Sequence, residues 1–136
     1  MLHPAVLADL LEIEVELAQD RHAGRFTKLE IDAPFVLCWL SDGENATAIR
    51  LDGTRYDSEP FAVDVVNARS QPVAAGRWPP GVCHGEHPVL GRPFACIQGT
   101  YEYHTFPGHT ADSWDQHRAK IRLADLLDHL LRKAGR

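Results

Sequence analysis

The chain of 136 residues has no long hydrophobic run and few cysteines. No apolar stretch approaches the roughly 20 residues of a membrane helix, and the first residues lack the basic head and apolar stretch of a secretory signal. Three cysteines, an odd number, do not suggest a disulfide framework in a chain large enough to fold without one. These absences predict a cytoplasmic protein whose thiols are reduced.

Clusters of basic residues are absent as well. Lys and Arg number 14 against 19 Asp and Glu, so the formal net charge is −5 and the pI is near 5.9. Binding to phosphate groups depends on clustered Lys and Arg that release counterions, so we expect no nucleic-acid partner, and without a membrane segment no membrane partner. The composition, 44% hydrophobic and 24% charged, is typical of one globular domain spanning residues 1–136.

Apolar periodicity predicts the order of the structural elements. Apolar residues recur at helical intervals from Pro4 to Asp20 and again from 121 to 131, which indicates a helix at each end of the chain. Short polar turns separate four apolar segments between them, which predicts an antiparallel meander of strands at 26–31, 35–40, 46–51 and 61–66. A loop rich in proline and glycine follows at 70–93. The predicted fold class is α+β, with the helices packed against one antiparallel sheet.

Residues able to bind a metal gather late in the chain. Five of the eight histidines and two of the three cysteines fall between residues 83 and 117. On one unbroken strand from 94 to 104, Cys96, Glu102 and His104 share a face because their numbers are all even, and His109 can fold back across the turn that follows. Zinc prefers thiolate and imidazole ligands and accepts a carboxylate, so these four residues predict a zinc site.

The spacing within this group leaves alternatives open. A straight strand places Cys96 and Glu102 roughly 20 Å apart, too far for one ion. Either Gly99 permits a bulge or tight turn that folds Cys96 back, which we favour, or the site draws on a second dense cluster in the loop, such as Cys83, His84 or His87. The plainer interpretation is that Cys96 is a core residue, Glu102 a paired carboxylate and the histidines ordinary polar groups.

Other conspicuous residues are expected to be structural. Cys38 lies in an apolar run and should pack as a small hydrophobe. Trp114 is expected to cover the core and Arg118 to pair with an acid, with Asp112 or Ser113 capping a helix start. The remaining histidines are expected to be solvated: His3, His22 and His129.

The residues between 94 and 118 resemble the bacterial Cys-Glu-His-His predicted metal-binding domain. The matching positions are Cys96, Glu102, His104, Pro107, His109, Asp112, Trp114, His117 and Arg118. Members of that family look like relatives of the ubiquitin-conjugating enzyme fold and are encoded near ubiquitin-like proteins and their activating enzymes. The resemblance implies a role in a bacterial ubiquitin-like modification system, with a ubiquitin-like protein or its activating enzyme as partner.

The order of elements is also similar to that of ubiquitin-conjugating enzymes, which run from a helix through a four-stranded meander and a proline-rich flap to an active-site segment and C-terminal helices. Trp78-Pro79-Pro80 resembles the flap. His87-Pro88, followed by Cys96, resembles the His-Pro-Asn motif that precedes the nucleophilic cysteine, with Val89 in place of the asparagine that helps stabilise an oxyanion. This similarity implies that Cys96 sits where a thioester would form.

Three functions follow from these observations. The first is a metal-binding domain that acts as a partner or accessory, with zinc held by Cys96, Glu102, His104 and His109. The second is a conjugating-like enzyme in which Cys96 accepts an acyl group and His104 or His109 serves as its base. The third is metal-assisted hydrolysis with Glu102 as the general base, although no helical His-Glu-x-x-His motif supports it.

Overall fold

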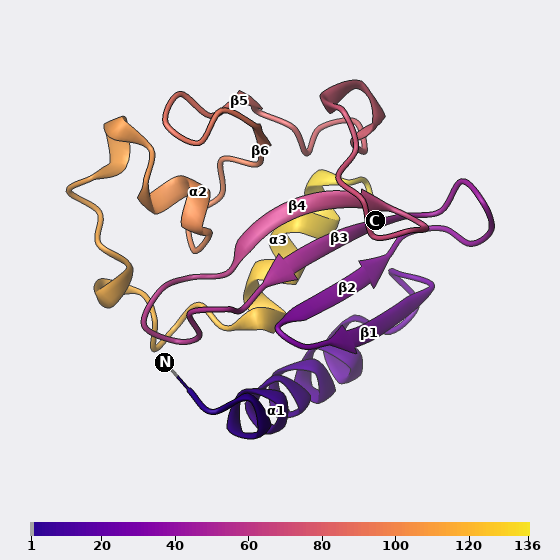
Figure 1. Ribbon diagram of the computed structural model, residues 1–136, viewed down its shortest axis with the longest axis horizontal. Coiled ribbons are helices and arrows are strands. Elements are labelled where there is room, and N and C mark those ends of the chain that lie inside the picture. The colour runs from indigo at the N-terminus through magenta and orange to yellow at the C-terminus, as the bar shows by residue number, and fades with distance from the viewer. Residues whose placement is uncertain (1) are drawn as a thin grey trace.

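Two helices pack on one face of a four-stranded antiparallel sheet in the computed structural model, which describes residues 2–136 (Figure 1). This confirms the predicted α+β class. The elements are α1 Pro4–His22, β1 Lys28–Asp32, β2 Phe35–Trp39, β3 Thr47–Asp52, β4 Ala62–Asn67, the 3-10 turn η1 Ala75–Arg77, β5 Gly85–Glu86, β6 Pro93–Phe94, α2 Tyr101–His104, η2 Pro107–His109, η3 Trp114–Gln116 and α3 Leu123–Lys133. None of the helices within residues 2–136 combines the length and apolar character needed to cross a membrane.

Helix α1 begins where the sequence predicts, because Pro4 occupies its first turn, where a missing N–H costs nothing. The ring of His3 accepts a hydrogen bond from the Ala5 N–H and so caps the helix. The helix ends at His22, two residues beyond the predicted end. The side chain of His22 is buried and its Nε2 lies 2.8 Å from the Ala124 carbonyl, so the prediction of a solvated His22 was wrong.

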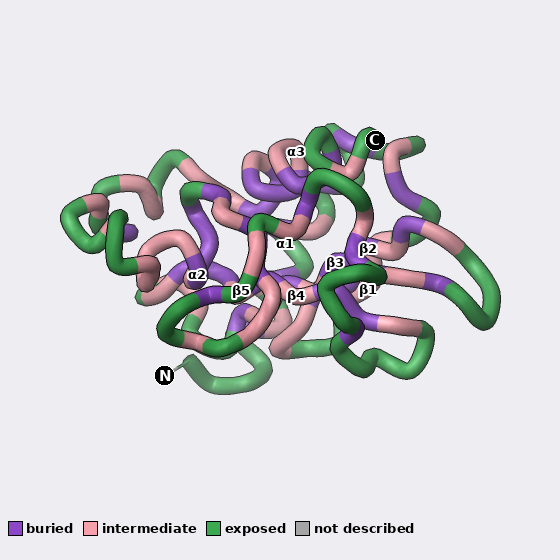
Figure 2. The backbone as a smooth tube through the Cα atoms, turned by 90° about the horizontal axis from the view of Figure 1, so that it is seen from above, coloured by how far each residue is buried: buried purple, intermediate pink, exposed green. Residues whose placement is uncertain are grey.

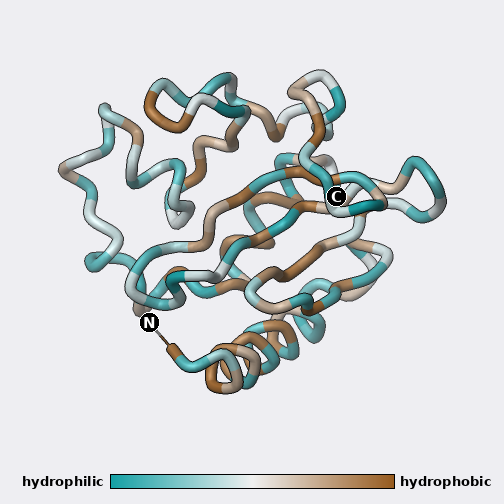
Figure 3. The backbone as a smooth tube through the Cα atoms, in the orientation of Figure 1, coloured by the Kyte–Doolittle hydropathy of each residue, from teal (hydrophilic) through white to brown (hydrophobic). Residues whose placement is uncertain are grey.

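The sheet is the predicted meander, with strands in the order β1-β2-β3-β4 and every neighbouring pair antiparallel. Alternate residues of the central strands are fully buried against the helices, as the pairing of Cys38 with Ile49 and of Ile49 with Val65 illustrates. Cys38 is therefore a core residue, as predicted, and burial raises the pKa of its thiol to about 12. Figure 3 shows the hydrophilic turn between β2 and β3 that the polar residues there predict.

Helix α3 closes the core against the sheet and α1. Its buried residues follow the predicted apolar stripe: Leu123, Ala124, Leu126, Leu127, Leu130 and Leu131. Truncating a fully buried leucine to alanine costs about 2–5 kcal/mol, which identifies this stripe as a main source of stability. Figure 2 shows buried segments along α3 and the strands, with most of the outer loops exposed.

The rest of the chain lies beyond the edge strand β4, where Figure 1 shows β5, β6 and α2. The proline-rich region is mostly irregular, as predicted, but contains η1 and the two-residue strand β5, which pairs with β6. Residues 94–104 were expected to be extended with an interruption at Gly99; the break at Gly99 is present, but the extended conformation is not. Strand β6 stops at Phe94, the chain turns at Gly99, and residues 101–104 form the helix α2.

Candidate functional site: a cysteine-histidine pair

Cys96 and His109 lie next to each other on the part of the chain that covers β4. The distance from Cys96 Sγ to His109 Nε2 is 3.7 Å, within the range of a hydrogen bond to sulfur. Both residues are half-buried. A thiol beside an imidazole nitrogen is the arrangement by which a neighbouring base activates a cysteine nucleophile. The structure thus brings together two of the four predicted site residues.

Local sequence explains how residues 13 positions apart come into contact. Gly99 adopts φ +99°, and a Cβ atom there would lie 2.6 Å from a methyl carbon of Ile121, so only glycine makes this turn without strain. Thr100 then starts α2, because its hydroxyl accepts a hydrogen bond from the Tyr103 N–H. The Tyr101 N–H donates to the Phe61 carbonyl and ties the start of α2 to the edge of the sheet. The Gly99 turn that the spacing required is therefore present.

The Cys96 side of the pair faces a small cleft of about 100 Å³. The cleft lies between the proline-rich loop and the end of α3, and its lining residues are Gly81, Val82, Cys83, His84, Cys96, Ile97 and Lys133. A Cβ atom on Gly81 would lie 2.7 Å from the Lys133 carbonyl oxygen, so glycine permits the close approach of loop and helix. The cleft therefore lies directly beside the Cys96 side chain.

Two opposing effects act on the Cys96 thiol. Burial raises its pKa because the thiolate is poorly solvated, and the positive charge of Lys133 partly opposes that rise. The net direction is upward, so the resting group at neutral pH is the thiol. Nucleophilic attack then requires a base to take the proton, and His109 is the base within reach.

Glu102 does not contribute to this pair. Its side chain is fully buried, Oε1 accepts a hydrogen bond from the Val63 N–H at 2.8 Å, and Oε2 forms an ion pair with Arg92 at 2.5 Å. Burial raises the pKa of the carboxyl, while Arg92 and the Val63 N–H oppose the rise. Because Glu102 lies on a helix instead of a strand, its side chain points into the core and braces α2 against β4.

His104 is also occupied elsewhere. Its Nδ1 lies 2.7 Å from the Asp112 carbonyl oxygen, and its Nε2 accepts a hydrogen bond from the Gly99 N–H at 3.2 Å. One neutral tautomer, with the proton on Nδ1, satisfies both contacts. Burial lowers the pKa of His104, which favours the neutral ring. His104 thus stabilises the Gly99 turn through Nε2 and connects α2 to Asp112 through Nδ1.

The four predicted ligands therefore do not meet at one point. Within residues 2–136, no three His, Cys, Asp or Glu side chains are grouped so that they could hold a metal ion. The carboxylate oxygens of Glu102 and the ring nitrogens of His104 already bond to other protein groups, so these residues do not fit a four-ligand zinc site. Nor does Glu102, buried and ion-paired, suit the role of a general base for hydrolysis.

The loop residues that the sequence raised as alternatives have separate roles. His87 is fully buried, its Nδ1 accepts hydrogen bonds from the Val89 and Leu90 N–H groups, and its Nε2 lies 2.9 Å from the Glu102 carbonyl oxygen. The His-Pro turn is thus joined to α2. Cys83 and His84 line the cleft, and the Cys83 thiol lies 3.8 Å from the Gly85 carbonyl oxygen.

A polar cluster supports the pair from the side opposite the core. The Asp112 carboxylate accepts hydrogen bonds from Tyr103 Oη and Gln98 Nε2, both at 2.8 Å, and also contacts His117 Nε2. These contacts, His117 first, hold the pKa of Asp112 well below its usual range. The predicted roles of the nearby residues are confirmed: Ser113 caps η3, Trp114 is buried, and Arg118 pairs with Asp57 and Asp115.

Sequence reasoning missed three residues around the site. Lys133 belongs to the last turn of α3, where a cation suits the helix dipole, so its sequence position gave no sign of a cleft. The sequence positions of Arg92 and Tyr103 do not indicate a role in the site either, because their contacts depend on the turn at Gly99 and on α2.

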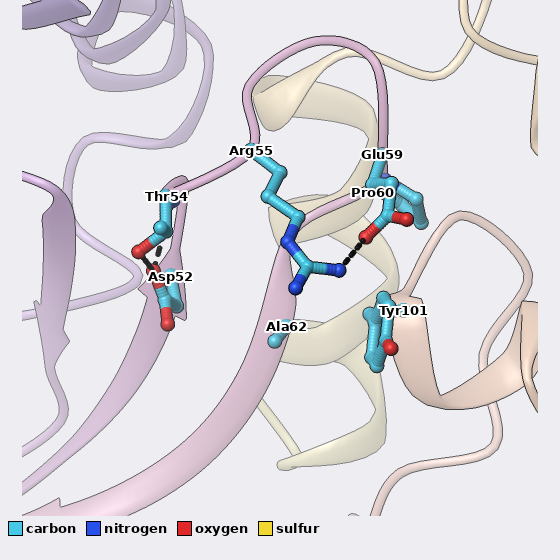
Figure 4. Close-up of a pocket in the computed structure, with 7 residues that line it drawn as sticks. All are labelled: Asp52, Thr54, Arg55, Glu59, Pro60, Ala62 and Tyr101. Atoms are coloured by element: carbon cyan, nitrogen blue, oxygen red, sulfur yellow. Dashed lines mark hydrogen bonds and ion pairs between the residues drawn. The ribbon is translucent and has the colours of Figure 1, made fainter. Parts of the chain in front are cut away.

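A larger pocket of about 250 Å³ lies at the other end of α2, where Tyr101 faces the β3 to β4 connection (Figure 4). Several of its polar groups bond to each other. Arg55 pairs with Glu59 at 2.9 Å, and Asp52 accepts hydrogen bonds from both the N–H and the hydroxyl of Thr54, which is turn chemistry. The Cys96 and His109 pair is therefore the stronger candidate site.

Comparison of the sequence with models of known protein families found no match. Comparison with curated proteins found none either.

Proposed function

We propose that this protein carries an acyl group as a thioester on Cys96 and acts as a ubiquitin-conjugating-like protein in a bacterial ubiquitin-like modification system. The observation that carries the proposal is the 3.7 Å distance between Cys96 Sγ and His109 Nε2 beside a narrow cleft. The order of elements, a helix, a four-stranded meander, an irregular proline-rich loop and a C-terminal helix, also supports it. The partner by resemblance is a ubiquitin-like protein or its activating enzyme.

The proposed step is a thioester exchange. His109 Nε2 accepts the proton of the Cys96 thiol, and Sγ attacks the carbonyl carbon of a donor thioester. A new carbon-sulfur bond forms on Cys96, the donor's carbon-sulfur bond breaks, and the departing thiolate takes the proton back from the imidazolium ring of His109. Electrons and protons balance without a further reactant.

The His-Pro turn in this proposal is a scaffold. Val89 is 65% exposed and its aliphatic side chain offers no hydrogen-bond donor to an oxyanion, so this position does not supply the stabilisation that an amide would. The buried contacts of His87 instead hold the loop that faces Cys96 against α2. We therefore expect exchange to depend mainly on the Cys96 and His109 pair.

The test is transfer from a bacterial ubiquitin-like protein supplied as its C-terminal thioester. The expected product is an adduct on the wild-type chain that a thiol reductant removes, absent from Cys96→Ala and formed much more slowly by His109→Ala. Cys83→Ser is the matched control, because Cys83 lines the same cleft without a histidine partner among its hydrogen bonds within residues 2–136. Equal adduct formation by wild type and Cys96→Ala, or none by either, refutes the proposal.

A metal-binding role is the second candidate, and the same distance favours it. Zn–S and Zn–N bonds of about 2.3 and 2.0 Å at a tetrahedral angle separate the two ligand atoms by about 3.5 Å. Cys96 and His109 would hold the ion, with its other ligands supplied by water or a partner. This candidate predicts zinc in protein purified without chelator, lost in Cys96→Ser and His109→Ala and retained in His104→Ala. Protein that folds and binds no zinc at micromolar concentration excludes it.

A further inference from the structure

The imidazole ring of His109 is not oriented by a second hydrogen bond within residues 2–136, unlike the ring of a typical catalytic histidine. Its Nε2 faces Cys96, and no other hydrogen bond to the ring is found within residues 2–136. The ring lies at the end of η2, after the exposed residues Pro107 and Gly108. A catalytic base normally needs a third group that orients it.

The aromatic side chain of Tyr103 fixes the orientation of the His109 ring. The rings of Tyr103 and His109 are stacked, with centroids 4.0 Å apart and an angle of 12° between their planes. Phe106 touches the histidine ring from another direction, with centroids 5.4 Å apart at 38°. Stacked aromatic pairs have a defined geometry, so the Tyr103 ring sets the plane in which the imidazole lies.

Tyr103 is itself anchored. Its hydroxyl donates a hydrogen bond to Asp112 Oδ2 at 2.8 Å, and Gln98 and His117 hold the same carboxylate. The tyrosine lies on α2 beside Glu102, whose buried ion pair fixes that helix. A continuous chain of contacts therefore runs from Asp112 through Tyr103 to His109 and the Cys96 thiol.

We propose that Tyr103 is a positioning residue for His109, anchored by Asp112, and that it sets the reactivity of Cys96. This inference rests on the proposed function, because it assumes that His109 serves Cys96 as a base. Tyr103 contacts the pair through the ring of His109, and within residues 2–136 it forms no hydrogen bond with the Cys96 thiol. It acts by stacking, in the place that a hydrogen-bonded carboxylate takes in a catalytic triad.

The experiment measures the rate at which iodoacetamide alkylates Cys96 in the full chain, at one pH and with chelator present, by mass spectrometry of the Cys96 peptide. Alkylation of Cys83 in the same sample is the internal reference for an intact fold. The variants are Tyr103→Leu, which removes the stacked ring, Tyr103→Phe, which keeps it, and each of these combined with His109→Ala.

We expect His109→Ala to slow alkylation of Cys96 about tenfold, the effect of one pKa unit on the thiolate fraction. Tyr103→Leu is expected to slow it to a similar extent, Tyr103→Phe to restore most of the rate, and Tyr103→Leu to have no further effect once His109 is alanine. If Tyr103 merely stabilised the fold, Tyr103→Leu would change the alkylation rate by the same factor in the wild-type and His109→Ala chains.

The outcomes separate the two proposals. If His109→Ala leaves the rate unchanged, the role of His109 in the proposed function is wrong and the inference on Tyr103 falls with it. If His109→Ala slows the reaction but Tyr103→Leu does not, or the two effects multiply, only the inference on Tyr103 is overturned. Should Tyr103→Leu not fold, Tyr103→Met replaces it, because it also removes the stacked ring and leaves an apolar side chain of similar length. The same loss, absent in the His109→Ala background, is then expected, and no loss overturns the inference.

Discussion

Removing the guanidinium group of Arg92 is expected to destabilise the protein by about 2–3 kcal/mol near neutral pH. Breaking a buried ion pair by deleting one partner costs about 3–5 kcal/mol, because the other charge is left unpaired. The Glu102 side chain is 0% exposed, but that of Arg92 is 32% exposed, so water near the replaced residue reduces the penalty to about 2–3 kcal/mol. The suitable variant is Arg92→Met, which keeps most of the apolar stem.

This loss should shrink in acid. Burial raises the folded-state pKa of Glu102, and Arg92 opposes the rise, so the variant has a still higher pKa. A group whose pKa is higher in the folded than in the unfolded protein favours folding while it is protonated, and this contribution is lost as pH rises through the folded pKa. The deficit of Arg92→Met is therefore largest at neutral pH and smaller towards the unfolded pKa of glutamate, about 4.3.

Urea unfolding followed by tryptophan fluorescence measures both quantities, at about pH 7 and about pH 5. The control is Arg92→Met combined with Glu102→Gln, which removes the charge and keeps an acceptor for the Val63 N–H. The double variant should recover much of the loss at neutral pH. A deficit below about 0.5 kcal/mol at neutral pH, or one that is the same at both pH values, would refute the structural role given to Glu102.

Three further results are expected. Lys133→Gln should raise the pKa of the Cys96 thiol, so the pH profile of its alkylation moves upward, and an unchanged profile would show that Lys133 does not act on Cys96. Gly99→Ala should destabilise the chain by about 2 kcal/mol or more in urea unfolding and exceed Gly24→Ala, because both have positive φ but only Gly99 lacks space; equal losses would contradict this. Cys38 should resist alkylation until the protein unfolds, and rapid labelling in the native state would disprove its burial.

Most of the fold could be predicted because its signals are local. The apolar stripe of α3, the proline that starts α1 and the polar turn after β2 each act within a few residues of the element they define. The predicted strands agree with the observed ones to within two residues. The buried position of His22 could not be predicted in this way, since its partner is the Ala124 carbonyl, far along the chain.

In the region from 94 to 104 the turn at Gly99 was predicted but the helix after it was not, because two interpretations of the same residues competed. Alternating side chains suggested a strand, whereas Gly99 followed by Thr100 is the signature of a turn and a helix start. The hydrogen bond from the Tyr101 N–H to the Phe61 carbonyl fixes the helix against the sheet edge, and this contact between distant segments leaves no mark in the local sequence.

That one change of secondary structure decides the composition of the site. On a strand, Glu102 and His104 would share a face with Cys96. On the short helix α2, Glu102 turns into the core towards Arg92, and Tyr103 turns outward to stack on His109. The carboxylate that suggested a metal ligand thereby braces the scaffold, and an aromatic residue that suggested nothing becomes the neighbour of His109. A cysteine and a histidine remain in contact, which provides a nucleophile beside a candidate base but only half of what a four-ligand metal site needs.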